Sequence, residues 1–148
     1  MNETSTKELE SYCTFRVDAL LFGVEVREVQ EVIRSQQTTR VPLAPAVVQG
    51  LMNLRGQIVS ALSLRERLGL PSADGQEDSM NVVVRSDEGP ISLLVDEIGD
   101  VVEVDIRRFE PPPETLLGEQ RELVRGVFKL ERELLLILNT DRVVSVCA

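Results

Sequence analysis

Hydrophobic residues alternate with polar ones at every second position near the start of the chain. Residues 12–18 (YCTFRVD) show this period of two, and residues 20–26 (LLFGVEV) resume it after a turn at Asp18-Ala19. A period of two is typical of a strand that buries one face. The pattern therefore predicts two antiparallel strands joined by a short turn.

The hydrophobic spacing changes over residues 26–33. Val26, Val29 and Ile33 stand at positions i, i+3 and i+7, which predicts a short helical turn. The next residues, 38–46, contain two prolines and predict an extended segment. The first regular pattern thus ends in a turn and an irregular connection.

A strand–turn–strand pattern follows over residues 50–64 (GLMNLRGQIVSALSL). Its turn falls at Arg55-Gly56, where the glycine supplies a positive φ without steric cost. Residues 64–71 predict a helical turn that is ended by a glycine and a proline. The polar residues 71–79 predict a surface connector.

The same order of elements restarts near residue 80. Period-two patterns predict further strands over residues 81–86, 91–98, 100–106, 122–130 and 133–139. A proline-led loop over residues 111–122 lies among them, and residues 140–145 predict a short helix with Thr140 as its N-cap.

The restart is an internal repeat. Residues 26–32 (VREVQEV) align with residues 95–101 (VDEIGDV) at an offset of 69, and residues 48–62 align with residues 124–138 at an offset of 76. The larger second offset fits the longer proline-led loop of the second half. The sequence therefore predicts a duplicated small unit.

The repeat predicts an all-β fold. Each half has about 60 to 70 residues and about five short strands, which favours a small closed barrel because closure removes exposed strand edges. We expect one subdomain at about residues 12–70 and a second at about residues 80–146. Residues 1–11 are polar and are expected to form a flexible N-terminus.

Composition and charge exclude several kinds of partner. The 148 residues carry a net charge of −9 and only five aromatic side chains, four Phe and one Tyr. Nucleic-acid binding needs a basic face, so it is not expected. No apolar stretch reaches the length of a membrane span, and the N-terminus lacks a signal pattern, so we expect a cytoplasmic protein without membrane insertion.

Catalytic and metal-binding signals are sparse. The chain has no histidine and no phosphate-binding glycine motif, and its two cysteines, Cys13 and Cys147, stand 134 residues apart. We therefore expect no cofactor and no metal, with Cys13 a core thiol. Abundant carboxylates leave a small carboxylate-dependent enzyme open as an alternative; they are Glu25, Glu28, Glu31, Asp96, Glu97 and Asp100. The near absence of aromatic sugar platforms favours a binding module, which would use the groove between the halves or an exposed strand edge.

The repeat separates features of the fold from features of function. Gly50 matches Gly126, which predicts a close backbone approach in both halves. Val29 and Val32 match Ile98 and Val101 and are expected in the core, whereas Glu31 matches Asp100 and is expected on a solvated face. The turn differs, because Arg55 corresponds to Glu131 and Gly56 to Arg132. Arg55 is therefore either an ordinary exposed arginine or a contact for an acidic partner.

Four blocks of residues carry a family resemblance. The NLRG turn (residues 53–56) with the strand after it, FGVEVREVQEVI (22–33), RVPLAPAVVQG (40–50) and LLVDEIGDVVEV (93–104) together resemble the CheW family. The resemblance covers residues 10–146. It departs from the family pattern at Ser60-Ala61 and at Ser63, which stands where an aspartate is common.

The resemblance implies a chemotaxis adaptor with two SH3-like, five-stranded β-barrel subdomains. Such adaptors couple the cytoplasmic tips of methyl-accepting chemotaxis receptors to the regulatory domain of a CheA-type histidine kinase, without catalysis, at membrane-associated arrays. A non-flagellar pathway, such as twitching motility or gene regulation, is equally compatible. The implied receptor-binding residues are Arg55, Val29, Glu31, Gly50, Asn53, Ile58, Val82 and Val101. The kinase-binding surface is not assigned.

Overall fold

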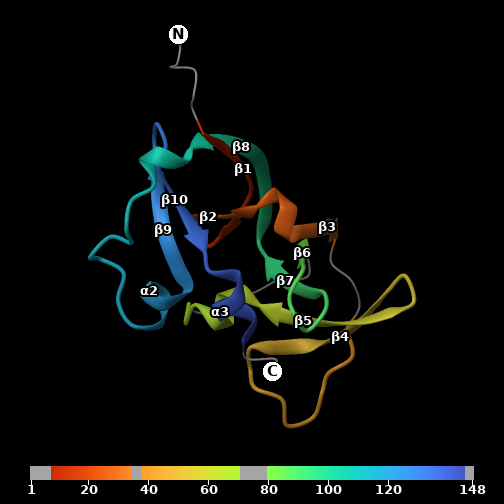
Figure 1. The fold of residues 1–148 in the computed structure, drawn as a ribbon. Coiled ribbons are helices and arrows are strands. Elements are labelled where there is room, and N and C mark those ends of the chain that lie inside the picture. The colour runs from red at the N-terminus through yellow and green to blue at the C-terminus, as the bar shows by residue number, and fades with distance from the viewer. Residues whose placement is uncertain (1–7, 35–37, 71–79, 146–148) are drawn as a thin grey trace.

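The computed structural model describes residues 8–34, 38–70 and 80–145, and its regular elements are mainly strands (Figure 1). Ten strands form two five-stranded sheets, which confirms the all-β class. Sheet A contains β1 (Leu9–Val17), β2 (Leu20–Glu25), β8 (Glu97–Asp105), β9 (Val124–Lys129) and β10 (Leu134–Leu138). Sheet B contains β3 (Val29–Arg34), β4 (Val48–Leu54), β5 (Gln57–Ser63), β6 (Met80–Val84) and β7 (Ile91–Val95).

Short helical segments stand at the ends of these strands. They are the 3₁₀ turns η1 (Val26–Glu28) and η3 (Ile106–Arg108), and the α-helices α1 (Leu64–Arg67), α2 (Glu119–Leu123) and α3 (Thr140–Val144). Helix α1 is capped by the Ser63 hydroxyl, which accepts from Glu66 N, as predicted for a helical turn after the second strand of a hairpin.

The two sheets have the same topology. Sheet A has the order β8-β1-β2-β10-β9 and sheet B the order β3-β6-β7-β5-β4. In each sheet the third and fourth strands pair in parallel (β2 with β10, β7 with β5), and the other neighbours pair antiparallel. This equivalence matches a duplication of the unit β1–β5 as β6–β10.

Each sheet combines the first two strands of one repeat with the last three strands of the other repeat. Strands β1 and β2 of the first repeat lie in sheet A, and strands β6 and β7 of the second repeat lie in sheet B. The sheets therefore do not divide at residues 70–80, where the sequence placed the boundary between subdomains. An alignment of repeats identifies equivalent strands, but it does not show which copy of a strand pairs with which neighbour.

The repeat is preserved in the strand register. In β4 a bulge places residues 48–50 opposite Leu62 and Ala61, and in β9 a bulge places residues 124–126 opposite Leu138 and Ile137. These positions differ by the offset of 76 read from the sequence. Gly50 and Gly126 stand at the ends of the two bulges, and each packs against a crossing backbone segment, as predicted.

The main hydrophobic core takes side chains from both sheets. Phe15, Phe22 and Leu136 come from sheet A, and Leu62 and Leu93 come from sheet B; all are buried. Two smaller clusters fill the individual barrels, one around Phe128 in sheet A and one around Met52 in sheet B. The shared core holds the two sheets together as one packed unit.

Three local predictions need correction. Residues 26–33 are a single 3₁₀ turn followed by strand β3, because the pairing of β3 with β6 overrides the helical spacing. The stretch 122–130 begins inside α2 and becomes strand only at Val124. Thr140 is the first residue of α3, whose N-cap is Asn139, with Oδ1 accepting from Arg142 N.

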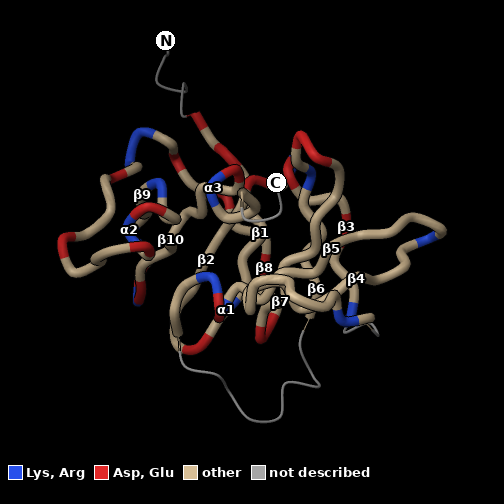
Figure 2. Tube along the Cα trace, turned by 90° about the horizontal axis from the view of Figure 1, so that it is seen from below, with Lys and Arg blue, Asp and Glu red and all other residues tan. Residues whose placement is uncertain are grey.

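Charged residues lie mostly on turns, connections and strand ends (Figure 2). Cys13 is half-buried and packs against the core, and burial raises the pKa of its thiol. The predicted connector at 71–79, residues 1–7 of the expected flexible N-terminus and Cys147 lie outside the described residues. The expectation of a flexible N-terminus over residues 1–11 needs correction at its end, because residues 9–11 belong to strand β1, which pairs with β8. No helix within the described ranges has the length and apolar character needed to cross a bilayer.

Candidate functional site

The turn between β4 and β5 holds Arg55 in an unusual backbone conformation. Arg55 has φ 56° and Gly56 has φ 86°, and Leu54 pairs with Gln57 on either side of them. Positive φ at both central residues defines a type I′ turn, which favours Asn-Gly or Gly-Gly. The side-chain Oδ1 of Asn53 accepts from Gly56 N at 2.9 Å and supports the turn.

Arg55 forms an ion pair across the open edge of sheet B. Its Nη2 lies 3.0 Å from Glu31 Oε1 on β3. The side chain of Arg55 remains 79% exposed, whereas that of Glu31 is 20% exposed. An exposed pair of this kind contributes about 0–1 kcal/mol to stability. Glu31 therefore orients the guanidinium more than the pair stabilises the fold.

Two apolar side chains that are close to this pair in the chain are exposed. Ile58 pairs directly with Asn53 across the hairpin and is 63% exposed, whereas its neighbour Val59 is buried in the barrel. On β3, Val32 follows Glu31 and is also exposed. The site thus combines one cation, a partly covered carboxylate and an exposed branched aliphatic surface.

The structure brings together four of the eight predicted site residues. Asn53, Arg55 and Ile58 share the β4–β5 hairpin, and Glu31 reaches the hairpin from β3. Val101 is 61% exposed on β8, the edge strand of sheet A, and it pairs with Cys13 of β1. It therefore belongs to the other sheet.

The remaining three predicted site residues are structural in this fold. Val82 is 1% exposed and belongs to the main core, so its side chain does not reach the surface. Gly50 is buried, and a Cβ built on it would lie 2.6 Å from the carbonyl oxygen of Thr39. Val29 is half-buried and packs against the core.

Three core expectations from the repeat were wrong. Val32 and Val101 occupy equivalent places in β3 and β8, and both are exposed, as is Ile98 of β8. Each strand is the edge of its sheet, so one side of it has no neighbouring strand within the sheet. Equivalent apolar residues therefore indicate a repeated surface here, and the sequence alone gave no signal to separate this from a repeated core.

The two crossovers between the sheets are held by polar contacts. At η1, Thr140 Oγ1 donates to Glu28 Oε1 at 3.0 Å, and burial raises the pKa of the Glu28 carboxyl. At the second crossover, the buried Arg65 reaches Asp96 at 2.6 Å. These contacts fix how the two barrels sit beside each other.

The candidate carboxylates take part in separate contacts with different partners. Glu31 binds Arg55, Asp96 binds Arg65, and Glu25 lies between Arg27 at 2.6 Å and Arg125 at 3.5 Å. Among the described residues no group of three or more His, Cys, Asp or Glu side chains is arranged to hold a metal ion. Three of the six candidate carboxylates thus serve ion pairs in this fold, and Glu28 accepts a hydrogen bond from Thr140.

The two adjacent barrels and the exposed β4–β5 hairpin are typical of a protein that works by binding other proteins on its surface. Comparison with known proteins gives the family: residues 11–147 match the model of the CheW-like domain. The chain belongs to the CheW-like family, which is a family of non-catalytic scaffold and adaptor proteins. It is a CheW-type chemotaxis adaptor, as the resemblance implied.

Relatives and a solved structure agree with this assignment. The chain is 30% identical over 129 residues to the chemotaxis protein CheW of Rhizobium meliloti, covering 87% of this chain and 83% of that protein. It is 27% identical over 136 residues to CheW of Bacillus subtilis, covering 92% and 87%. The crystal structure of the scaffolding protein TtCheW from Thermoanaerobacter tengcongensis superposes with a TM-score of 0.81 at 26% identity, covering 89% of this chain and 90% of that one.

Proposed function

We propose that this protein couples the cytoplasmic tips of methyl-accepting chemotaxis receptors to the regulatory domain of a CheA-type histidine kinase. The observation that carries the proposal is the Arg55 turn. It displays an exposed guanidinium, held by Glu31, next to the exposed side chain of Ile58. A positive φ strains the backbone of Arg55, and its exposed side chain gains no burial energy that would offset this strain. This favours a role for Arg55 in contacting a partner.

The receptor tip, a helical hairpin, would place apolar side chains against Ile58 and Val32. Arg55 would add a charge-assisted hydrogen bond to a carboxylate or carbonyl on the tip, which is stronger than a bond between neutral groups. Asn53 and Glu31 would act by setting the shape of the turn and the direction of the guanidinium. Val29, Gly50 and Val82 would affect binding only through folding, because Gly50 and Val82 are buried and Val29 packs against the main core.

Membership of the family supports the proposed kinase partner and the proposed site of action. A cytoplasmic adaptor would meet both partners at membrane-associated receptor arrays, where high effective concentration allows each contact to be weak. Receptor signals would then shift the populations of kinase conformations through the shared adaptor. The same surfaces would serve a flagellar or a non-flagellar chemosensory pathway.

An enzymatic function is disfavoured by the use of the carboxylates. Glycosidase chemistry needs two carboxyl groups facing a substrate cleft. Here Glu31 and Asp96 face arginines instead. We therefore propose a protein without catalysis, cofactor or metal, and without nucleic acid as a partner.

A binding assay tests the proposal. The purified protein, a CheA-type kinase and a receptor cytoplasmic fragment from the same genome are combined in pull-downs with the wild type, Arg55→Glu and the matched control Arg132→Glu. Arg132 occupies the corresponding turn of the other hairpin, so the control makes the same charge change at an equivalent place. We expect Arg55→Glu to weaken receptor binding about tenfold or more and to leave kinase binding intact.

Two results would contradict the proposal. If the wild type binds neither cognate partner, the receptor–kinase coupling role fails for this chain. If Arg55→Glu and Arg132→Glu reduce receptor binding equally, the effect is one of net charge, and the Arg55 turn is not the contact.

A further inference from the structure

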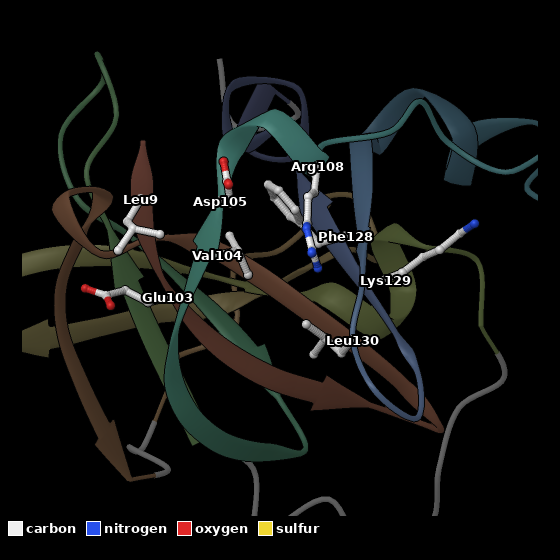
Figure 3. Close-up of a pocket in the computed structure, with 8 residues that line it drawn as sticks. All are labelled: Leu9, Glu103, Val104, Asp105, Arg108, Phe128, Lys129 and Leu130. Atoms are coloured by element: carbon white, nitrogen blue, oxygen red, sulfur yellow. The ribbon is translucent and has the colours of Figure 1, made fainter. Parts of the chain in front are cut away.

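The two edge strands of sheet A flank a hollow. Strands β8 and β9 are the ends of the sheet order, so neither has a strand neighbour on its outer side within the sheet. Between them lies a hollow of about 360 Å³, bounded on one side by residues 103–105 of β8 and on the other by residues 128–130. Figure 3 shows Arg108 reaching from η3 into this space, near Val104 and the ring of Phe128.

In sheet B an ion pair bridges the gap between the edge strand and the neighbouring hairpin turn. Sheet A lacks the residues for the equivalent ion pair. In sheet B, the ion pair of Arg55 and Glu31 links the β4–β5 turn to the edge strand β3. The residues that match this pair in the second repeat are Glu131 and Asp100. Two carboxylates repel each other, so this ion pair cannot form between β8 and the β9–β10 turn.

Backbone groups of both edges are turned toward the gap. Val127 exchanges its N–H and C=O with Glu110 on the outer side of β9, so Lys129, two residues further, presents its own N–H and C=O on that side. On β8, Ile106 N donates to Glu8 O on the β1 side. The alternation of strand hydrogen bonds then turns Glu103 away from β1 and toward the gap.

The hollow has an apolar floor and a basic end. Val104 and Leu130 are half-buried and pack on the buried Phe128, and Leu9 lines the same space. Arg108 and Lys129 are exposed and also line a second, adjoining hollow of about 380 Å³. Arg107 is engaged by Asp105, to which its Nη2 donates at 2.8 Å, and Lys129 Nζ lies 3.6 Å from Glu110 Oε1 in an exposed ion pair.

We propose that this hollow binds an extended peptide segment of a partner protein by strand addition. The segment would pair with the outer edge of β9 at Lys129, place one apolar side chain on the floor formed by Val104, Phe128 and Leu130, and set a carboxylate two residues away, on the same face of the added strand, against Arg108. An open strand edge gives affinity through main-chain hydrogen bonds, and the pocket for alternate side chains gives selectivity. The site lies on sheet A, away from the Arg55 turn of sheet B, and it goes beyond the proposed function.

A peptide selection tests this proposal on the whole chain. Random linear 12-residue peptides displayed on phage are selected against the immobilised protein, and enriched sequences are synthesised with a fluorescein label for anisotropy titrations. We expect the enriched sequences to share an apolar residue two positions from an Asp or Glu. The double variant Arg108→Glu/Lys129→Glu should weaken their binding about tenfold or more, whereas the matched double variant Arg40→Glu/Arg142→Glu should change it by less than about twofold.

Backbone methylation distinguishes strand addition from simple occupation of a pocket. Methylating alternate amide nitrogens of the best peptide removes donors to β9, and in one of the two alternating registers it should weaken binding about tenfold or more. The proposal is overturned if no sequence is enriched, or if the enriched peptides bind the Arg108→Glu/Lys129→Glu variant as tightly as the wild type. It is also overturned if both methylated registers bind like the unmodified peptide. All four substituted residues are exposed, so thermal unfolding of each variant should stay close to that of the wild type.

Discussion

Arg65 Nη2 lies 2.6 Å from Asp96 Oδ2, and this contact joins the two sheets where the chain crosses between them. Asp96 is the single residue between β7 of sheet B and β8 of sheet A. Its carboxylate also accepts from Asp18 N at 2.7 Å, in the turn between β1 and β2. One buried arginine therefore ties α1 to two separate parts of sheet A.

The first prediction concerns this contact. Arg65→Met should lower the free energy of unfolding by about 2–3 kcal/mol, because it leaves the Asp96 carboxylate without its main partner in a partly buried place. Urea unfolding followed by circular dichroism measures the change. Arg142→Met is the control, since the side chain of Arg142 forms an exposed pair with Glu122, at 3.4 Å, and its loss should cost about 0–1 kcal/mol. Equal losses in both variants would show that the inter-sheet contact has no special weight.

Much of the fold could be predicted because its signals are local. The period of two in residues 12–18 and 20–26, and the glycine at Arg55-Gly56, depend on residues that are close in the chain. The duplication was also readable, because equivalent bulges at Gly50 and Gly126 keep the same offset as the sequence.

The exchange of hairpins between the sheets could not be predicted, because it depends on long-range pairing. Strand β2 pairs in parallel with β10, more than a hundred residues later in the chain, and no local pattern specifies that partner. The same limit explains β3: its helical spacing was real, but pairing with β6 decides its conformation.

The candidate site was partly predictable. The Arg55 turn stood out because the two repeats differ there, and the structure joins it to Glu31. The repeat could not separate a buried valine such as Val82 from an exposed one such as Val101, because exposure depends on whether the strand is central or at an edge.

The second prediction concerns the paired glycines of the bulges. A Cβ at Gly50 would lie 2.6 Å from Thr39 O, and a Cβ at Gly126 would overlap the Phe109 ring and Glu110 O. Gly50→Ala and Gly126→Ala should each lower the free energy of unfolding by about 2–4 kcal/mol, because backbone must move in both cases. Gly89→Ala is the control: its φ is 102° but nothing lies within 4 Å, so about 1 kcal/mol is expected. Losses no larger than that of the control would contradict the close approach.

The third prediction separates the backbone of Arg55 from its side chain. Arg55→Gly should raise the free energy of unfolding by about 0.5–1 kcal/mol, because glycine relieves the cost of φ 56° and the ion pair with Glu31 contributes little. The same variant should lose receptor binding if the guanidinium is the contact. Thermal unfolding and the receptor pull-down are measured on one preparation. Retained binding with increased stability would show that the turn, rather than the arginine, makes the contact.

The fourth prediction concerns the charge of Glu28. Burial raises the pKa of its carboxyl in the folded protein, against a smaller lowering by the Thr140 hydroxyl. The folded state therefore holds this proton more tightly than the unfolded chain does, and ionisation of Glu28 lowers stability as the pH rises through the raised pKa. Glutamine keeps the oxygen that accepts from Thr140 and carries no charge. Glu28→Gln should thus be more stable than the wild type at pH 7, and the difference should vanish below about pH 4, where glutamate is protonated in both states.

A second glutamate, Glu133, is expected to show the opposite dependence of stability on pH. Arg16 donates to Glu133 at 2.8 Å and 3.0 Å, and this hydrogen bonding lowers the pKa of the Glu133 carboxyl. Here the unfolded chain binds the proton more tightly, so the stabilisation is present above the ordinary glutamate pKa and is lost as the pH falls through the lowered one. Glu133→Gln should therefore be less stable than the wild type at pH 7 and equal to it in strong acid. Unfolding free energies of both variants between pH 3 and pH 8 should diverge in opposite directions from the wild type, and parallel curves would show that neither carboxyl is linked to folding as its contacts imply.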